Sequence, residues 1–163
     1  MTALLEKHDG ALADLMSVRL WLRLLSCAMT IEKRLRRGFA GRFETTLPRF
    51  DVMAALDRRP EGLRMSDLSR QLLVSNGNMT GVVQSLRADG LVEVLPVKSD
   101  RRASLVRLTE PGQDRFGELA QAHHSWVDAM LTDLTPSDRQ ALHDLLGRLK
   151  LSLANNGGVD EPA

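Results

Sequence analysis

Two short helix patterns in tight succession, followed by two strand patterns, constrain the fold of this chain more than any other feature. Ser66 is the predicted N-cap of the first helix, which carries Leu68 on its inner face. Ser75 or Asn76 caps the second helix, and Gly90 provides its C-terminal stop. Two helices of this length around a small turn, the second of them polar on its outer face, predict a helix-turn-helix.

The strand patterns lie directly after these helices. The sequences LVEVL at 91–95 and ASLVRL at 103–108 predict a hairpin whose loop, PVKSDRR, is too long for a two-residue turn. This loop contains Asp100 followed by Arg101 and Arg102. An arginine pair before a strand is typical of a solvated turn, a phosphate clamp or a finger that enters a nucleic-acid groove. The helix-turn-helix directly upstream favours the groove.

A long helix pattern precedes this module. Residues 11–39 contain no proline, and the middle of the stretch is apolar nearly all round. A helix of that kind is buried on more than one side, for example between its own domain and a partner chain. Gly38 and Gly41 are predicted to end it, and a second helix is predicted to start near Pro48, a residue that the first turn of a helix accepts.

Two further helix patterns follow the module. Thr109 is the predicted cap of a helix from Glu110 to Leu134, and the sequence TPSD at 135–138 opens the last helix with a variant of the capping box. Leucines recur at helical spacing along that last helix, from Leu142 to Leu153. These flanking helices carry more apolar surface than one small module can cover, so we predict that they pair with a second copy in a C2 dimer.

The predicted fold is therefore mostly α with a small two- to three-stranded β wing. Its parts are a dimerisation helix at 11–45, a winged helix-turn-helix at 46–109, dimerisation helices at 110–155 and a mobile tail at 156–163. The net charge is only +1, so a nucleic-acid partner must be argued from local clustering. The chain has one cysteine, an N-terminus unlike a signal peptide and no apolar run of about 18 residues, which predicts a cytoplasmic protein without a membrane partner.

At this point the chain resembles the MarR-type transcriptional regulators. Their wing motif is matched by Asp100-Arg101-Arg102, five residues, Leu108-Thr109, two residues and Gly112, and SNGNMTGVVQSLRADGLVE at 75–93 is similar to their recognition helix and its exit. The similarity extends over residues 12–153. It implies a triangular homodimer that binds a pseudo-palindromic operator, with a ligand pocket between the dimerisation helices and the winged module. Many relatives carry arginines where this chain has Val94 and Leu95.

The resemblance implies that the second helix and the wing contact operator DNA. It assigns Arg101 to the minor groove and Arg102 to an ion pair with Asp100, and the two arginines can also exchange these roles. The outward residues of the second helix carry amide, hydroxyl and guanidinium groups, which suit base edges or phosphates. The predicted DNA-binding residues are Ser75, Asn76, Asn78, Thr80, Gln84, Arg87, Lys98, Asp100, Arg101 and Arg102.

A basic cluster at 32–42, which contains five Lys and Arg residues and the single acid Glu32, has two interpretations. It is either a solvated surface that adds to DNA affinity, or an anion site, because several guanidinium groups near a helix end bind phosphates or a carboxylate strongly. The runs RLWLRLLSCAMTIEKRLRR and LPRFDVMAALDRRP resemble the subgroup that responds to aromatic acids or their coenzyme A thioesters. The effector-binding residues implied are Trp21, Cys27, Arg34, Arg36, Arg37, Arg42, His123 and Trp126.

Other functions have weaker support in the residues. The motifs HExxH, GxSxG and CxxC and a phosphate loop are missing, so we expect neither an enzyme nor a cofactor. Neighbouring His123 and His124 would point about 100° apart on a helix, which disfavours a metal-sensing relative. Cys27 lies among apolar residues and the chain has no tyrosine, which favours a buried structural thiol over a redox sensor. The sequence thus favours a ligand-responsive repressor, and the main alternative is a dimeric winged-helix module that contacts protein.

Overall fold

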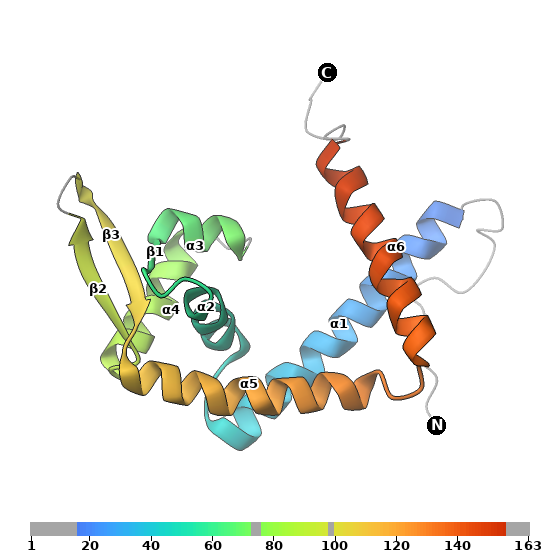
Figure 1. Cartoon of the computed structure of the whole chain (residues 1–163), viewed down its shortest axis with the longest axis horizontal. Coiled ribbons are helices and arrows are strands. Elements are labelled where there is room, and N and C mark those ends of the chain that lie inside the picture. The colour runs from blue at the N-terminus through green and yellow to red at the C-terminus, as the bar shows by residue number, and fades with distance from the viewer. Residues whose placement is uncertain (1–15, 73–75, 98–99, 156–163) are drawn as a thin grey trace. The chain divides into compact units, whose positions relative to one another are not determined.

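A computed structural model describes residues 16–72, 76–97 and 100–155 (Figure 1). The described part forms six helices and one sheet of three strands. The elements in chain order are α1 Met16–Phe43, α2 Leu47–Asp57, β1 Leu63–Arg64, α3 Met65–Gln71, α4 Asn76–Ala88, β2 Val92–Val97, β3 Asp100–Leu108, α5 Glu110–Met130 and α6 Pro136–Asn155. The predicted mostly helical fold with a small β wing is confirmed.

The chain divides into two compact units, Met1–Ser125 and Trp126–Ala163. The first unit contains α1 to α4, the sheet and most of α5. In it, α3 and α4 pack against each other and against α2, and the β2–β3 hairpin extends beside them (Figure 1). The second unit contains the end of α5 and the whole of α6.

The sheet is antiparallel with the strand order β1-β3-β2. The sequence predicted a long loop in the hairpin, and this prediction is wrong because β2 continues to Val97 and β3 already begins at Asp100. Pro96 suggested a loop, yet it pairs with Ser104 beside an irregularity in the ladder. Proline is tolerated there because β2 is an edge strand, where a missing N–H group removes no inner hydrogen bond.

The predicted end of α1 and the predicted start of α3 are also wrong. Helix α1 does not end at Gly38 or Gly41 but continues to Phe43, because burial of Leu35 and Phe39 outweighs the roughly 1 kcal/mol that a helical glycine costs. Helix α3 is capped by Arg64, without a side-chain hydrogen bond, and Ser66 lies inside it. Strand β1 ends at Arg64 and α3 begins at the next residue, so the last residue of the strand also serves as the N-cap of the helix.

Two predicted caps are confirmed by hydrogen bonds. The N–H of Gly112 donates to Oγ1 of Thr109 over 3.1 Å at the start of α5. At the start of α6, the N–H of Asp138 donates to Oγ1 of Thr135 over 3.2 Å, and the N–H of Thr135 donates back to the Asp138 carboxylate over 3.1 Å. This is the reciprocal pattern of a capping box. Helix α5 ends at Met130, four residues before the predicted Leu134.

The core of the first unit is built around α2, which buries six of its side chains. The largest fully buried side chains come from almost every element of that unit: Phe39, Val52, Met53, Leu56, Leu68, Met79, Leu86, Val106 and Leu119. The three buried residues of α4 fix this helix with one side against α2 and the sheet. The opposite side of α4 therefore faces outward.

Large apolar side chains remain exposed on two other helices. In α1 they are Met16, Val18, Leu20, Trp21 and Met29, and in α6 they are Leu142, Leu145, Leu146, Leu151 and Leu153. Helix α6 buries none of its residues in the single chain. The sequence predicted that the middle of α1 is buried on more than one side, and in the single chain this surface is uncovered. Across the described residues, the helices are too polar or too short to span a membrane.

Candidate functional site

Helix α4 presents a line of small residues at its outermost surface. Its buried residues Met79, Val83 and Leu86 define the inner side. At about 100° per residue, Gly77 and Gly81 lie opposite that side. A Cβ atom added at either glycine would meet no atom within 4 Å. We call these two positions the glycine crest, and a helix with such a crest allows its backbone to come close to another molecule.

Polar side chains flank the glycine crest on both sides. Thr80, Gln84 and Arg87 are exposed and share one flank of α4, as the sequence predicted. Asn78 is also exposed but lies about 160° from Thr80 around the helix axis, so it belongs to the other flank. The sequence placed all these residues on one outer face, and the structure divides them between the two flanks of the crest.

The wing is held by a pair of charged residues across its two strands. Arg107 Nε donates to Oε1 of Glu93 over 2.5 Å, and these residues are direct partners in the β2–β3 register. The other predicted DNA-binding residues are described only in part. Ser75 and Lys98 lie outside the described residues, as do the side chains of Asn76, Asp100, Arg101 and Arg102, whose backbone belongs to α4 and β3. The ion pair between Asp100 and Arg102 stays a prediction.

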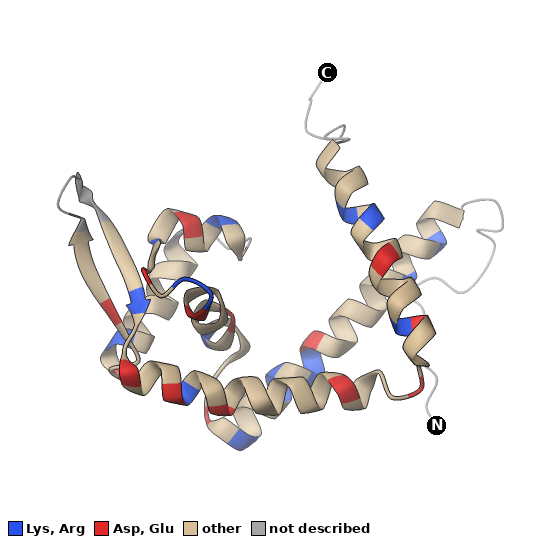
Figure 2. Ribbon diagram, in the orientation of Figure 1, with Lys and Arg blue, Asp and Glu red and all other residues tan. Residues whose placement is uncertain are grey.

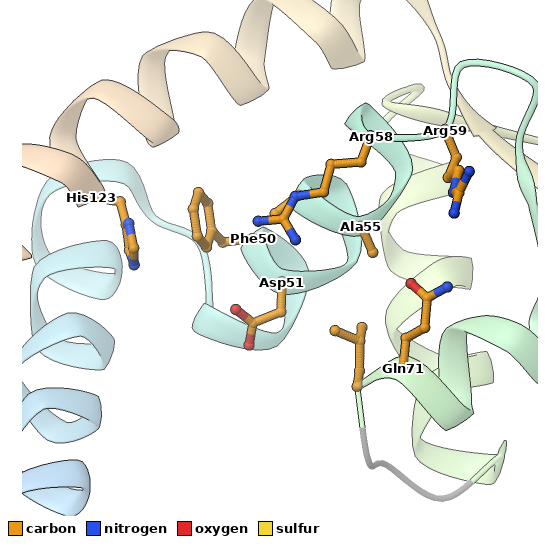
Figure 3. Close-up of a pocket in the computed structure, with 9 residues that line it drawn as sticks. Phe50, Asp51, Ala55, Arg58, Arg59, Gln71 and His123 are labelled. Carbon is orange, nitrogen blue, oxygen red and sulfur yellow. The ribbon is translucent and has the colours of Figure 1, made fainter. Parts of the chain in front are cut away.

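A cavity of about 610 Å³ lies between α2, the end of α3 and α5 (Figure 3). One wall is aromatic, with the rings of Phe50 and His123 stacked 4.7 Å apart between centroids and Phe39 4.8 Å from Phe50. The other walls combine the polar or charged residues Asp51, Arg58, Arg59 and Gln71 with apolar ones. The lining residues are Phe50, Asp51, Ala54, Ala55, Arg58, Arg59, Gln71, Leu72 and His123.

The ionisable groups of the cavity have shifted pKa values. Burial raises the pKa of Asp51 from 3.8 to about 6, against a smaller lowering by Arg36, and Glu32 adds a further small rise. Burial, and then the neighbouring His124, lower the pKa of His123. At neutral pH the cavity therefore combines an ionised carboxylate, a neutral imidazole and two guanidinium groups. It can bind a planar aromatic group together with a polar or charged substituent.

The Asp51→Asn protein should lose part of the pH dependence of folding stability. The folded state binds the Asp51 proton more tightly than the unfolded chain, so the contribution of this group favours folding below about pH 4 and is lost as the pH rises through about 6. At pH 7 the variant should be more stable than the parent by about 1 to 2 kcal/mol, which is less than the full pKa shift would give because Asp51 is only partly buried and solvent screens its charge, and this difference should vanish toward pH 4. Urea unfolding across this pH range measures it.

Asp57→Asn is the control for this prediction, because Asp57 is an exposed acid on the same helix. Its stability should follow that of the parent at every pH. A constant difference between the Asp51→Asn protein and the parent from pH 4 to pH 7 would contradict the prediction.

Sequence reasoning identified only one residue of this cavity, His123. It missed Asp51, although a single carboxylate in the apolar run FDVMAAL is a signal of a half-buried acid. Of the other predicted effector residues, Arg42 lines a separate cavity of about 390 Å³ between the end of α1 and α5. The remaining ones line neither cavity.

The basic cluster lies on the C-terminal half of α1 (Figure 2). Arg34, Arg36 and Arg37 are exposed, and Arg36 Nη2 forms an ion pair with Glu32 Oε1 at 2.6 Å. Arg36 lowers the pKa of the cavity residue Asp51 through its positive charge, so this part of α1 lies near the cavity.

The structure does not bring Trp21, Cys27 and Trp126 together in one described cavity. Trp21 is 56% exposed, and at 1.5 Å per residue it lies about 22 Å from Arg36 along α1. Trp126 belongs to the second unit. Cys27 is exposed in the single chain, so the prediction of a buried thiol is wrong there. Of the apolar neighbours that suggested burial, Leu24, Leu25 and Ile31 are half-buried and Ala28 is exposed. Within the described ranges, groups of three or more His, Cys, Asp or Glu that could hold a metal ion do not occur.

Comparisons with known proteins agree on one family. A sequence model of the MarR family matches residues 44–103. The transcriptional activatory protein BadR of Rhodopseudomonas palustris is 33% identical over 150 residues, which cover 89% of this chain and 85% of that protein. The helix-turn-helix-type transcriptional regulator PecS of Dickeya dadantii is 25% identical over 131 residues, with 79% and 78% covered. The crystal structure of a MarR family transcriptional regulator from Silicibacter pomeroyi matches with a TM-score of 0.70 and 31% identity, over 88% of this chain and 99% of that one.

Proposed function

The chain belongs to the MarR family of winged-helix transcriptional regulators, and on that premise we propose that it binds operator DNA as a homodimer under the control of a small effector. The glycine crest of α4 carries this proposal. A helix with small residues along its outermost line and amide and hydroxyl groups on its flanks can lie deep in a major groove and reach base edges. The wing then carries Arg101 and Arg102 toward the adjacent minor groove, where the narrow width attracts a guanidinium group.

The exposed apolar surfaces of α1 and α6 support the dimer. Ten large hydrophobic side chains on these two helices are uncovered in the single chain. They are 37% to 72% exposed, so burial of each against a second copy would contribute a part of the roughly 1.5 to 3 kcal/mol that full burial of such a side chain gives, and together they favour a stable dimer. A C2 dimer presents its two recognition helices to successive major grooves about 34 Å apart.

We propose that the effector is an aromatic acid or its coenzyme A thioester. The aryl group would stack in the cavity beside Phe50 and His123, which already form an aromatic wall. The carboxylate or the nucleotide phosphates would bind to guanidinium groups of the basic cluster, of which Arg36 acts electrostatically on the cavity residue Asp51. Binding would favour a dimer whose recognition helices no longer match successive grooves, so that the operator is released and repression ends. The relative BadR is named as an activatory protein. A reporter assay distinguishes the two roles, because activation and repression by this chain would change expression in opposite directions.

One titration series tests the proposed function. Fluorescence anisotropy with a duplex from upstream of the protein's own gene should show two chains bound per site, and the affinity should fall about a thousandfold between 50 and 200 mM salt. Benzoyl-coenzyme A, as the simplest aryl thioester, or benzoate should then displace the duplex, and coenzyme A alone should not. The Arg36→Ala, Arg37→Ala double variant should need more thioester, whereas Arg107→Gln, at a wing arginine paired with Glu93, should behave as the parent.

Absent or salt-insensitive binding to the duplex would contradict the DNA-binding function and favour the protein-interaction module. Salt-dependent binding without displacement by either aryl compound would leave the DNA-binding function standing and exclude this effector class.

A further inference from the structure

One side chain of α2 holds the C-terminal end of α4. Arg49 Nη1 donates to Ser85 Oγ, and Arg49 Nη2 donates to Asp89 Oδ2, both over 2.5 Å. Ser85 is one turn before the end of α4, and Asp89 directly follows its last residue. The guanidinium group thus forms hydrogen bonds at two positions that are four residues apart and lie on the same side of the helix.

This contact is directional, unlike the apolar packing that also holds α4. Apolar burial of Met79, Val83 and Leu86 sets which side of α4 faces the core, but it is less directional than a hydrogen bond and restricts small rotations and shifts of the helix less tightly. A guanidinium fork with two donors in fixed geometry does define it. The Arg49 side chain is only 16% exposed, and its Nε atom is buried and, in the described part of the chain, lacks a hydrogen-bond partner. The guanidinium group therefore depends on Ser85 and Asp89.

We infer that Arg49 is a positioning residue for DNA recognition: it fixes α4 on α2 and thereby sets the orientation of the glycine crest, without contacting DNA itself. The inference rests on the proposed function. Ser85 lies about 140° around α4 from Thr80, so the contact holds the helix by the flank that does not carry Thr80 and Gln84. That polar flank and the crest stay open for DNA.

The same short helix connects this contact to the cavity. Asp51 follows Arg49 by two residues, which places the two side chains about 160° apart around α2. Asp51 and Phe50 line the cavity (Figure 3). Arg49 holds α4 through its hydrogen bond to Asp89. Helix α2 has only 11 residues, so a ligand that shifted this helix at the cavity would also shift the anchor of the recognition helix.

Asp89→Asn is the sharpest test, because two explanations predict opposite signs. If Asp89 only repels the DNA backbone, removal of its charge should strengthen binding to the duplex. If Asp89 anchors Arg49, the variant should bind about tenfold more weakly, with Arg49→Met showing a similar loss. The double variant should lose no more than either single variant, because both remove the same contact.

The salt dependence separates positioning from a direct phosphate contact. The slope of log affinity against log salt should be the same for Arg49→Met and the parent, whereas loss of a phosphate contact would lower it by about one. Arg49→Lys should restore part of the affinity, since an ammonium group can reach one of the two acceptors. Asp67→Asn is the matched control, because Asp67 is an acid of α3 whose partner Arg70 is on the same helix, and it should bind at least as tightly as the parent.

Urea unfolding shows which variants are folded under the binding conditions. If Arg49→Met does not fold, Ser85→Ala replaces it as the second test variant, because it removes only one of the two hydrogen bonds. Its affinity should fall less than that of Asp89→Asn. The inference would be overturned if folded Asp89→Asn bound the duplex as tightly as the parent or more tightly, or if the salt slope of Arg49→Met were lowered by one. In either case, binding of the duplex by the parent would still support the proposed function. A parent that binds no duplex would overturn both.

Discussion

The Arg101→Ala protein should bind the operator duplex about ten- to a hundredfold more weakly than the parent. Arg101 is the second residue of β3, at the end of the wing that is distant from the helices. A guanidinium group inserted into a narrow minor groove is attracted by the concentrated negative potential there, and its loss costs roughly 1 to 3 kcal/mol. Anisotropy titrations at fixed salt measure the change.

Two neighbouring residues make the result specific. Asp100→Ala should weaken binding less than Arg101→Ala, because it removes only the preorganisation of the wing. Arg107→Gln is the matched control, because Arg107 lies on the same strand but is paired with Glu93 across the sheet. It should bind almost as the parent does. Unchanged binding by Arg101→Ala would show that the wing assignment is wrong, and a large loss with Arg102→Ala instead would exchange the roles of the two arginines.

The Gly112→Ala protein should be less stable than the parent by roughly 2 to 4 kcal/mol. A Cβ atom at this position would lie 1.9 Å from the carbonyl oxygen of Leu91 and 2.9 Å from its carbonyl carbon. This carbonyl cannot move away easily, because it accepts the N–H of Thr109 over 3.1 Å, and Thr109 in turn donates its hydroxyl to the carbonyl of Gly90 over 2.6 Å. The alanine would push the first turn of α5 away from the base of the wing.

Gly117→Ala on the same helix is the control. A Cβ atom there would meet nothing within 4 Å, so this variant should be more stable than the parent by up to about 1 kcal/mol, the ordinary preference of a helix for alanine. Urea unfolding of the three proteins gives the comparison. Equal stabilities of the Gly112→Ala protein and the parent would mean that α5 can shift at no cost, which would contradict the tight packing at Leu91.

The sequence by itself determined those features that depend on neighbouring residues. The caps at Thr109 and Thr135 are hydrogen bonds between residues three apart, so the residue types alone predict them. The helix-turn-helix and the hairpin follow from the spacing of apolar residues and turn residues, and the wing motif ending at Gly112 led to the family. At this glycine a Cβ atom would lie only 1.9 Å from the carbonyl oxygen of Leu91.

Local rules were wrong where burial competes with them. The rule that glycine ends a helix did not hold at Gly38 and Gly41, because the buried Phe39 between them keeps α1 helical. Pro96 did not end β2, because its position on an edge strand requires no inner hydrogen bond. At the glycines the deciding energy comes from burial of Phe39 against residues far along the chain, and at Pro96 the deciding factor is the place of its strand in the sheet.

Only the tertiary structure decided the candidate effector site and the anchoring of α4. The sequence shows Asp51 only as a single acid in an apolar run, and it becomes a cavity residue with a raised pKa when α2, α3 and α5 come together around it. Arg49 and its acceptors are 36 and 40 residues apart, so their spacing carries no signal. The physical reason is the same for both. Desolvation and a two-donor hydrogen-bond fork act over a few ångströms in space, and the folding of distant helices onto one core is what brings these groups within that range.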